Sequence, residues 1–145
     1  MKNFLCLFIL TYLILGCGSL PKSQESSLYK PLEPTISGRF TDIPIPGGFK
    51  LLQNESYSFF TDNVRVAVLK YSGRADAERV INFYKEQMPI YNWDLINIIE
   101  YGRRLLNFEN EKESCIISIE PKKFSTKITI SLGPKTAKKI EKPIK

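Results

Sequence analysis

The sequence contains no histidine and only three cysteines. Without histidine, the chain lacks the usual general base at neutral pH and the most common metal ligand. It also lacks the base that serine and cysteine nucleophiles most often need, which excludes serine-histidine and cysteine-histidine hydrolases. Cys6 and Cys17 lie in an N-terminal segment that is interpreted below as processed and lipidated. Cys115 is then alone in the body of the chain, where neither a disulfide nor a cysteine-based zinc site can form.

The N-terminal apolar run is too short to span a membrane. It extends from Phe4 to Leu15, twelve residues, whereas a transmembrane helix needs about twenty. Met1-Lys2-Asn3 gives the run a positively charged start, and this combination is typical of a signal peptide.

The run ends in Ile14-Leu15-Gly16-Cys17, which resembles the lipobox of bacterial lipoproteins. The resemblance implies cleavage between Gly16 and Cys17, a diacylglyceryl thioether on Cys17 and acyl chains such as palmitate. Two or three such chains, at about 0.8 kcal/mol per buried methylene, hold a protein on a membrane permanently. Gly18 is not the aspartate that resembles an inner-membrane retention signal, so we expect the outer membrane if the source has two membranes. The alternatives are an ordinary secretory signal with a chance cysteine, or an uncleaved anchor.

The net charge of +6 is concentrated at the C-terminus. Residues 134–145 contain one glutamate and five lysines, which are Lys135, Lys138, Lys139, Lys142 and Lys145. The body of the chain is nearly neutral, which does not favour nucleic acid as a partner. We interpret the basic tail as a contact with anionic lipid headgroups or cell-wall polymers. A plain solvated tail is the alternative.

The composition predicts four segments. Residues 1–16 are the signal peptide, and residues 17–39 are the lipidated cysteine and a flexible tether rich in Ser, Pro, Gln and Lys. Residues 40–133 are a single domain, and residues 134–145 are the basic tail. The segment Asp42–Phe49 alternates proline with isoleucine and ends in a glycine turn, so we expect it to lie extended along a sheet edge.

The hydrophobic pattern of the domain predicts one helix and six strands. Asp76 is the expected N-cap of a helix with apolar residues at spacings of three and four, and Asn92 suits its left-handed end. Apolar and polar residues alternate in several runs, and turn residues separate neighbouring runs. These two signals predict strands at 56–60, 64–71, 93–100, 104–109, 114–120 and 127–132. We therefore expect an α+β fold with two strands, one helix and four strands, in which the amphipathic helix packs on one face of an antiparallel sheet.

Part of this pattern resembles a known group of proteins. Ile43-Pro44-Ile45-Pro46-Gly47-Gly48-Phe49, followed by Phe83-Tyr84, Met88-Pro89 and Asn92-Trp93, is similar to small bacterial envelope lipoproteins of unknown function. These carry an IPxPxGF start and an FYxxxMPxxGW helix end, and Asn92 stands here at the usual glycine. The resemblance implies a shared fold and an envelope location but no activity.

Few residues qualify as candidate sites. Cys115 alternates with isoleucines, which favours a buried structural thiol over a reactive one. We interpret Trp93 as a packing residue and not as a ligand-stacking residue. Arg103 and Arg104 form a basic turn that either faces solvent or holds a phosphate or carboxylate. No spacing forces two carboxylates together, so a glycosidase-like or metal-assisted mechanism is unsupported. The acidic residues concerned are Asp62, Asp76, Asp94, Glu100, Glu109 and Glu120.

Three functions therefore stay open after the sequence alone. The leading hypothesis is a tethered envelope module, monomeric and without cofactor or catalysis, that binds another envelope protein or a wall polymer. The others are a lipoprotein whose basic tail tunes membrane contact, and a small enzyme that uses carboxylates.

Overall fold

A computed structural model describes residues 30–37, 40–101 and 103–135. The chain divides into two compact units, and the second begins at Pro31 and contains every element described below. No helix among the described residues has the length and apolar character needed to cross a membrane.

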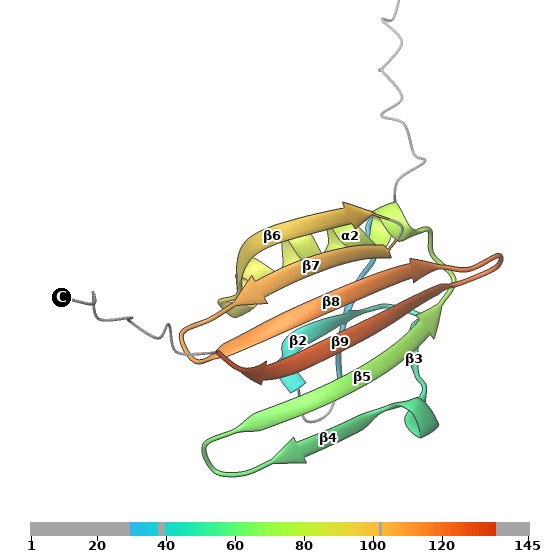
Figure 1. The fold of residues 1–145 in the computed structure, drawn as a ribbon. Helices are drawn as coiled ribbons and strands as arrows, with labels where there is room; N and C mark the ends of the chain where they lie inside the picture. The colour runs from blue at the N-terminus through green and yellow to red at the C-terminus, as the bar shows by residue number, and fades with distance from the viewer. Residues whose placement is uncertain (1–29, 38–39, 102, 136–145) are drawn as a thin grey trace, which may run out of the picture. The chain divides into compact units, whose positions relative to one another are not determined.

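Within the described residues, seven strands form one antiparallel sheet (Figure 1). Its order is β3-β5-β9-β8-β7-β6, and β4 pairs with β5 along the same side as β3. The last four strands form the meander that the short turns predict. The strands are β3 (Lys50–Leu51), β4 (Tyr57–Phe60), β5 (Arg65–Gly73), β6 (Asp94–Tyr101), β7 (Arg103–Glu109), β8 (Glu113–Pro121) and β9 (Thr126–Pro134).

Helix α2 (Ala77–Gln87) covers one face of this sheet, as its apolar stripe predicts (Figure 1). The Asp76 side chain caps the helix by accepting a hydrogen bond from the Arg79 backbone N–H, 2.9 Å away. A 3-10 turn, η3 (Met88–Tyr91), continues the helix and ends at Asn92, whose φ of 63° lies in the left-handed region. Both predicted end signals are therefore confirmed.

The core lies between α2 and the facing side chains of the sheet. One row of cross-strand partners crosses four strands and is buried, and it consists of Leu69, Ile130, Ile117 and Leu106. The opposite face of the sheet has no covering element in the part of the chain that is described. The predicted α+β architecture is thus confirmed, with a single helical layer on one side of an antiparallel sheet.

The expectation that Asp42–Phe49 lies along the edge of this sheet is wrong. Strand β2 (Phe40–Pro46) pairs instead with β1 (Pro34–Ser37) in a separate two-stranded ribbon, and it packs beside α2 on the core face. Its prolines donate no backbone hydrogen bonds, and Phe40, Ile43 and Ile45 are buried. Burial of these side chains favours the core over an exposed edge. The expected glycine turn is present at Gly48, with φ of 84°.

The domain also starts earlier than the composition suggests. Strand β1 falls inside residues 17–39, for which we expected a flexible tether, and the compact unit begins at Pro31. Residues 31–37 therefore belong to the domain. The signal peptide, the lipid attachment site and the rest of the tether lie outside the described residues, as does the tail beyond Lys135.

The strands place every turn of the sheet at one of two ends. We call the end that holds the β8–β9 turn, residues 122–125, the tip end, and the end that holds the β7–β8 turn, residues 110–112, the far end. The Gly47 N–H donates to the Glu33 carbonyl at 2.7 Å, so the chain enters the domain at the tip end. The Lys135 N–H donates to the Lys112 carbonyl at 2.8 Å, so the chain leaves β9 at the far end.

Candidate functional site

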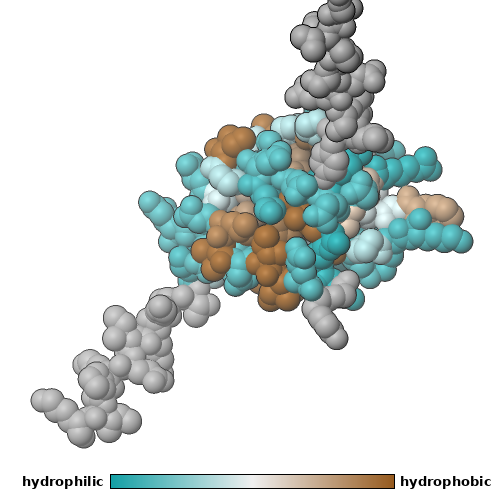
Figure 2. All heavy atoms as spheres, turned by 90° about the horizontal axis from the view of Figure 1, so that it is seen from above, coloured by the Kyte–Doolittle hydropathy of each residue, from teal (hydrophilic) through white to brown (hydrophobic). Residues whose placement is uncertain are grey.

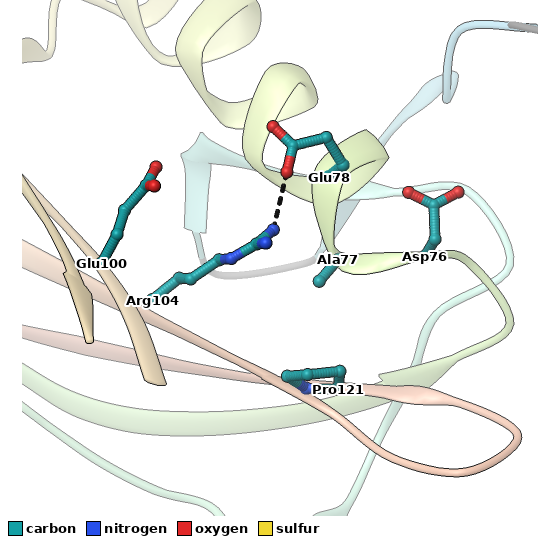
Figure 3. A pocket seen from close by; sticks show the side chains of 6 residues that line it. All are labelled: Asp76, Ala77, Glu78, Glu100, Arg104 and Pro121. Atoms are coloured by element: carbon teal, nitrogen blue, oxygen red, sulfur yellow. Dashed lines mark hydrogen bonds and ion pairs between the residues drawn. The ribbon is translucent and has the colours of Figure 1, made fainter. Parts of the chain in front are cut away.

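A pocket of about 540 Å³ lies where the start of α2 approaches the ends of β6, β7 and β8 (Figure 3). Arg104 of β7 reaches across it, and its Nη1 donates to Oε2 of Glu78 at 2.7 Å. Glu100 of β6 extends into the pocket on the other side of this guanidinium (Figure 3). Ala77, Asp76 and Pro121 complete the lining.

The pocket carries more negative than positive charge. Asp76, Glu78 and Glu100 supply three carboxylates against the single guanidinium of Arg104. Asp76 accepts the capping hydrogen bond from Arg79, whereas Glu100 has no hydrogen-bond or ion-pair partner among the described residues. This arrangement suits a further cationic group, such as the amine of a lysine or the guanidinium of an arginine. No group of acidic, cysteine or histidine residues in the described ranges is arranged to hold a metal ion.

An apolar strand edge adjoins this pocket. Strand β6 ends the sheet order, so its outer backbone groups have no partner strand within residues 40–101 and 103–135. Leu95, Ile96 and Ile99 on this strand are 38%, 51% and 52% exposed. Figure 2 looks down on the side that β6 borders in Figure 1, and brown side chains gather there among teal ones. Glu100 belongs to both features, because it lies on β6 and lines the pocket.

The residues singled out in the sequence are mostly explained by the fold. Cys115 is buried, and burial raises the pKa of its thiol well above the ordinary value, so the structural interpretation is confirmed. Trp93 is buried too, and its Nε1 donates to the Asp42 carbonyl at 2.9 Å. Arg104 binds a carboxylate, which is one of the two roles predicted for the basic turn. This carboxylate belongs to Glu78 of the same domain.

The remaining acidic candidates do not converge on one catalytic centre. Glu109 binds Lys135 at 2.6 Å, and Glu120 binds Lys122 through Oε1. Asp62 is exposed beside a different cavity. Of these candidates, only Asp76 and Glu100 meet at one pocket, which Glu78 also lines. The attachment site Cys17, the cleavage site at Gly16 and four of the five tail lysines lie outside the described residues.

A second ionic cluster escaped the sequence analysis. Arg65 of β5 donates two hydrogen bonds to Asp42 of β2, at 2.9 and 2.7 Å, and two to Glu113 of β8, of which one is 2.8 Å long. These contacts raise the pKa of the guanidinium, chiefly through the hydrogen bonds to Glu113 and then to Asp42. The partners are 23 and 48 positions from Arg65 in the sequence, so no local spacing signals the cluster. It clamps β2 to the sheet.

The chain was compared with family models, with curated proteins and with solved structures, and none of them matches it.

Proposed function

We propose that this protein is a lipid-anchored module of the bacterial envelope whose domain binds an extended segment of another envelope protein along β6. The proposal is one of binding without catalysis. The exposed apolar edge of β6, with Leu95, Ile96 and Ile99, carries it. An unpaired strand edge offers a row of N–H and C=O groups to which an added strand can bond, and apolar side chains add contact area.

The charges around β6 favour a segment that carries a basic residue. Asp94 and Glu100 lie at the two ends of the strand, and Glu100 leads into the negatively charged pocket. An added strand that places a lysine or arginine beside Glu100 therefore gains an ion pair there. A second copy of this chain would bind less favourably at this edge. Antiparallel pairing of two β6 strands about Asn97 sets Asp94 opposite Glu100, and these like charges repel each other.

The anchor in this proposal is the one that the sequence predicts. Cleavage before Cys17 and lipidation of its thiol would attach the domain to a membrane, and the similarity to small envelope lipoproteins supports the same location. Metabolic labelling with an alkyne fatty acid tests this part. We expect the wild-type chain to take up the label and Cys17→Ala to lose it, and a labelled Cys17→Ala chain would contradict the anchor.

Site-specific photocrosslinking in intact cells tests the binding edge. A photoreactive residue in place of Ile99 should give a discrete protein adduct, whereas one in place of Ile36, which is 56% exposed on β1, should not. The charge reversal Glu100→Lys should then abolish the Ile99 adduct. Glu86→Lys, on the exposed side of α2, is the matched control and should preserve it.

Two results would contradict the binding edge, and a third would contradict the role of the charged pocket beside it. An adduct of twice the chain's own mass would assign β6 to a dimer of this protein. Equal adducts from positions 36 and 99 would assign them to chance collisions. An adduct that survives Glu100→Lys at full yield would remove the role of the negatively charged pocket.

A further inference from the structure

The tip end of the domain carries an aromatic ring among cations. Phe124, in the turn between β8 and β9, is 78% exposed, and the turn projects beyond the neighbouring strands (Figure 1). Lys123 precedes it, with Nζ 5.2 Å from the ring centroid. Lys122 also belongs to this turn and is ion-paired with Glu120. An exposed ring next to lysines suits a membrane interface, where the ring enters the headgroup region and the ammonium groups stay in water.

A cavity of about 610 Å³ beside Phe124 adds two further cations. Lys50 lines it from the start of β3, and Arg74 lines it from the position directly after β5. None of its lining residues is acidic, and it shares no residue with the pocket at the start of α2. Neither cation has a hydrogen-bond or ion-pair partner in the described part of the chain. The side chains thus leave two free positive charges close to the exposed ring.

The entry of the chain into the domain lies at this same end. The chain enters the domain at the tip end, where Glu33 accepts the hydrogen bond from Gly47, next to Gly48 and Lys50 of the cavity. Residues 18–32 would join that point to the lipid on Cys17. This step rests on the anchor of the proposed function, because the anchor sets which end of the domain lies nearest the membrane.

We infer that the β8–β9 turn and the cavity beside it rest on the anionic surface of the membrane, with Phe124 in the interface and with Lys123, Lys50 and Arg74 against lipid phosphates. The negatively charged pocket at the start of α2 lies at the same end of the sheet but shares no residue with this cavity. The basic tail leaves from the other end. Nine residues of β9 at about 3.3 Å each separate the two ends by about 30 Å, well beyond the Debye length of about 8 Å. Lys135, at the start of the tail, is paired with Glu109.

Vesicle binding by the mature chain from Gly18 onward, without lipid, tests the inference. All buried core residues of the described part lie between Phe40 and Leu132, so this chain keeps the whole core. We expect it to bind vesicles of phosphatidylglycerol and phosphatidylcholine, and not vesicles of phosphatidylcholine alone. Phe124→Ala should weaken the partition about tenfold, as expected for partial burial of a phenylalanine ring. Lys123→Ala should weaken it about fivefold at low salt.

Matched variants at the far end and on the open face are the controls. Phe59→Ala removes a ring that is 61% exposed on β4, and Lys112→Ala removes a cation from the β7–β8 turn. Both should bind like the wild-type chain, and truncation after Lys135 should leave most of the binding in place. In high salt the effect of Lys123→Ala should fade while that of Phe124→Ala persists.

Several outcomes would overturn the inference. These are loss of binding on truncation with no effect of Phe124→Ala, equal binding to neutral vesicles, and binding to a soluble anionic wall polymer without binding to vesicles. Absence of any binding would overturn it too. The anchor and the binding edge are measured separately, by fatty-acid labelling and by crosslinking at β6, so a failure here is distinguishable from a failure of the proposed function.

Discussion

Replacement of Arg65 by methionine tests whether the partly buried ionic cluster of Arg65, Asp42 and Glu113 holds β2 on the sheet. The change removes four hydrogen bonds and the only positive charge in the cluster, and it leaves the carboxylates of Asp42 and Glu113 facing the gap. Methionine keeps much of the apolar length of arginine, so packing changes little. The expected effect is therefore mainly electrostatic.

The expected loss of unfolding free energy depends on how exposed Arg65, Asp42 and Glu113 are. Breaking a fully buried ion pair costs about 3–5 kcal/mol, whereas exposed pairs contribute about 0–1 kcal/mol. The side chains of Arg65, Asp42 and Glu113 are 29%, 30% and 13% exposed, between these limits but nearer the buried one. We expect the variant to lose about 3 kcal/mol of unfolding free energy, which for a domain of this size lowers Tm by about 15 °C.

The loss should depend on pH with a definite sign. Burial alone would raise the pKa of Asp42, but the hydrogen bonds and charge of Arg65 outweigh it and hold this pKa below 3.8. A lowered pKa stabilises the fold above about pH 4, and this stabilisation is lost as the pH falls through the pKa of the folded state. Without Arg65, burial is opposed only by the smaller effect of a backbone hydrogen bond to Asp42, so that pKa rises. The difference between wild type and variant should therefore be largest at neutral pH and shrink as the pH falls from the raised pKa of Asp42 in the variant to its lowered pKa in wild type.

Urea unfolding followed by the fluorescence of the single tryptophan, Trp93, measures these differences. Arg104→Met is the matched control, because its ion pair with Glu78 is 36% and 59% exposed and should contribute less than about 1 kcal/mol. If Arg65→Met costs no more than this control, or if its cost grows toward acid pH, the reasoning is refuted.

Two further substitutions examine the core by the same unfolding assay. Tyr84→Phe removes a buried hydroxyl that has no hydrogen-bond partner within the described residues, so we expect a gain of about 1 kcal/mol; a loss would reveal a partner such as a bound water. Cys115→Ser places a hydroxyl among apolar neighbours and should cost about 1–3 kcal/mol. Unchanged stability would contradict the burial of the thiol.

The elements that local pattern specifies were predicted correctly. The apolar spacing of α2, its cap at Asp76 and its left-handed end at Asn92 are all properties of neighbouring residues. The hairpin of β4 and β5 and the four-stranded meander also follow from short turns between alternating runs. Periodicity and turn chemistry therefore determine most of the sheet.

Features that depend on distant residues were missed. The position of β2 depends on Arg65 and Trp93, which contact Asp42, and on Glu113, which contacts Arg65; all three are distant from Asp42 in the sequence. Strand β1 has four residues, the first of which is Pro34, and they are too few to show a period. The pocket joins Glu78 and Glu100, and their pairing depends on how the helix crosses the sheet. Long-range packing decides such contacts, and single-sequence patterns do not encode it.

The entry and exit of the chain at opposite ends of the sheet determine how the domain would respond to tension. A pull between residues 33 and 135 acts along the strands and loads β9 in shear against both β5 and β8. The backbone hydrogen bonds of β9 to these two strands therefore bear the force simultaneously. Strand β1 has β2 as its partner over only four residues. Under load β1, which has few backbone hydrogen bonds to break, should therefore detach before the sheet yields.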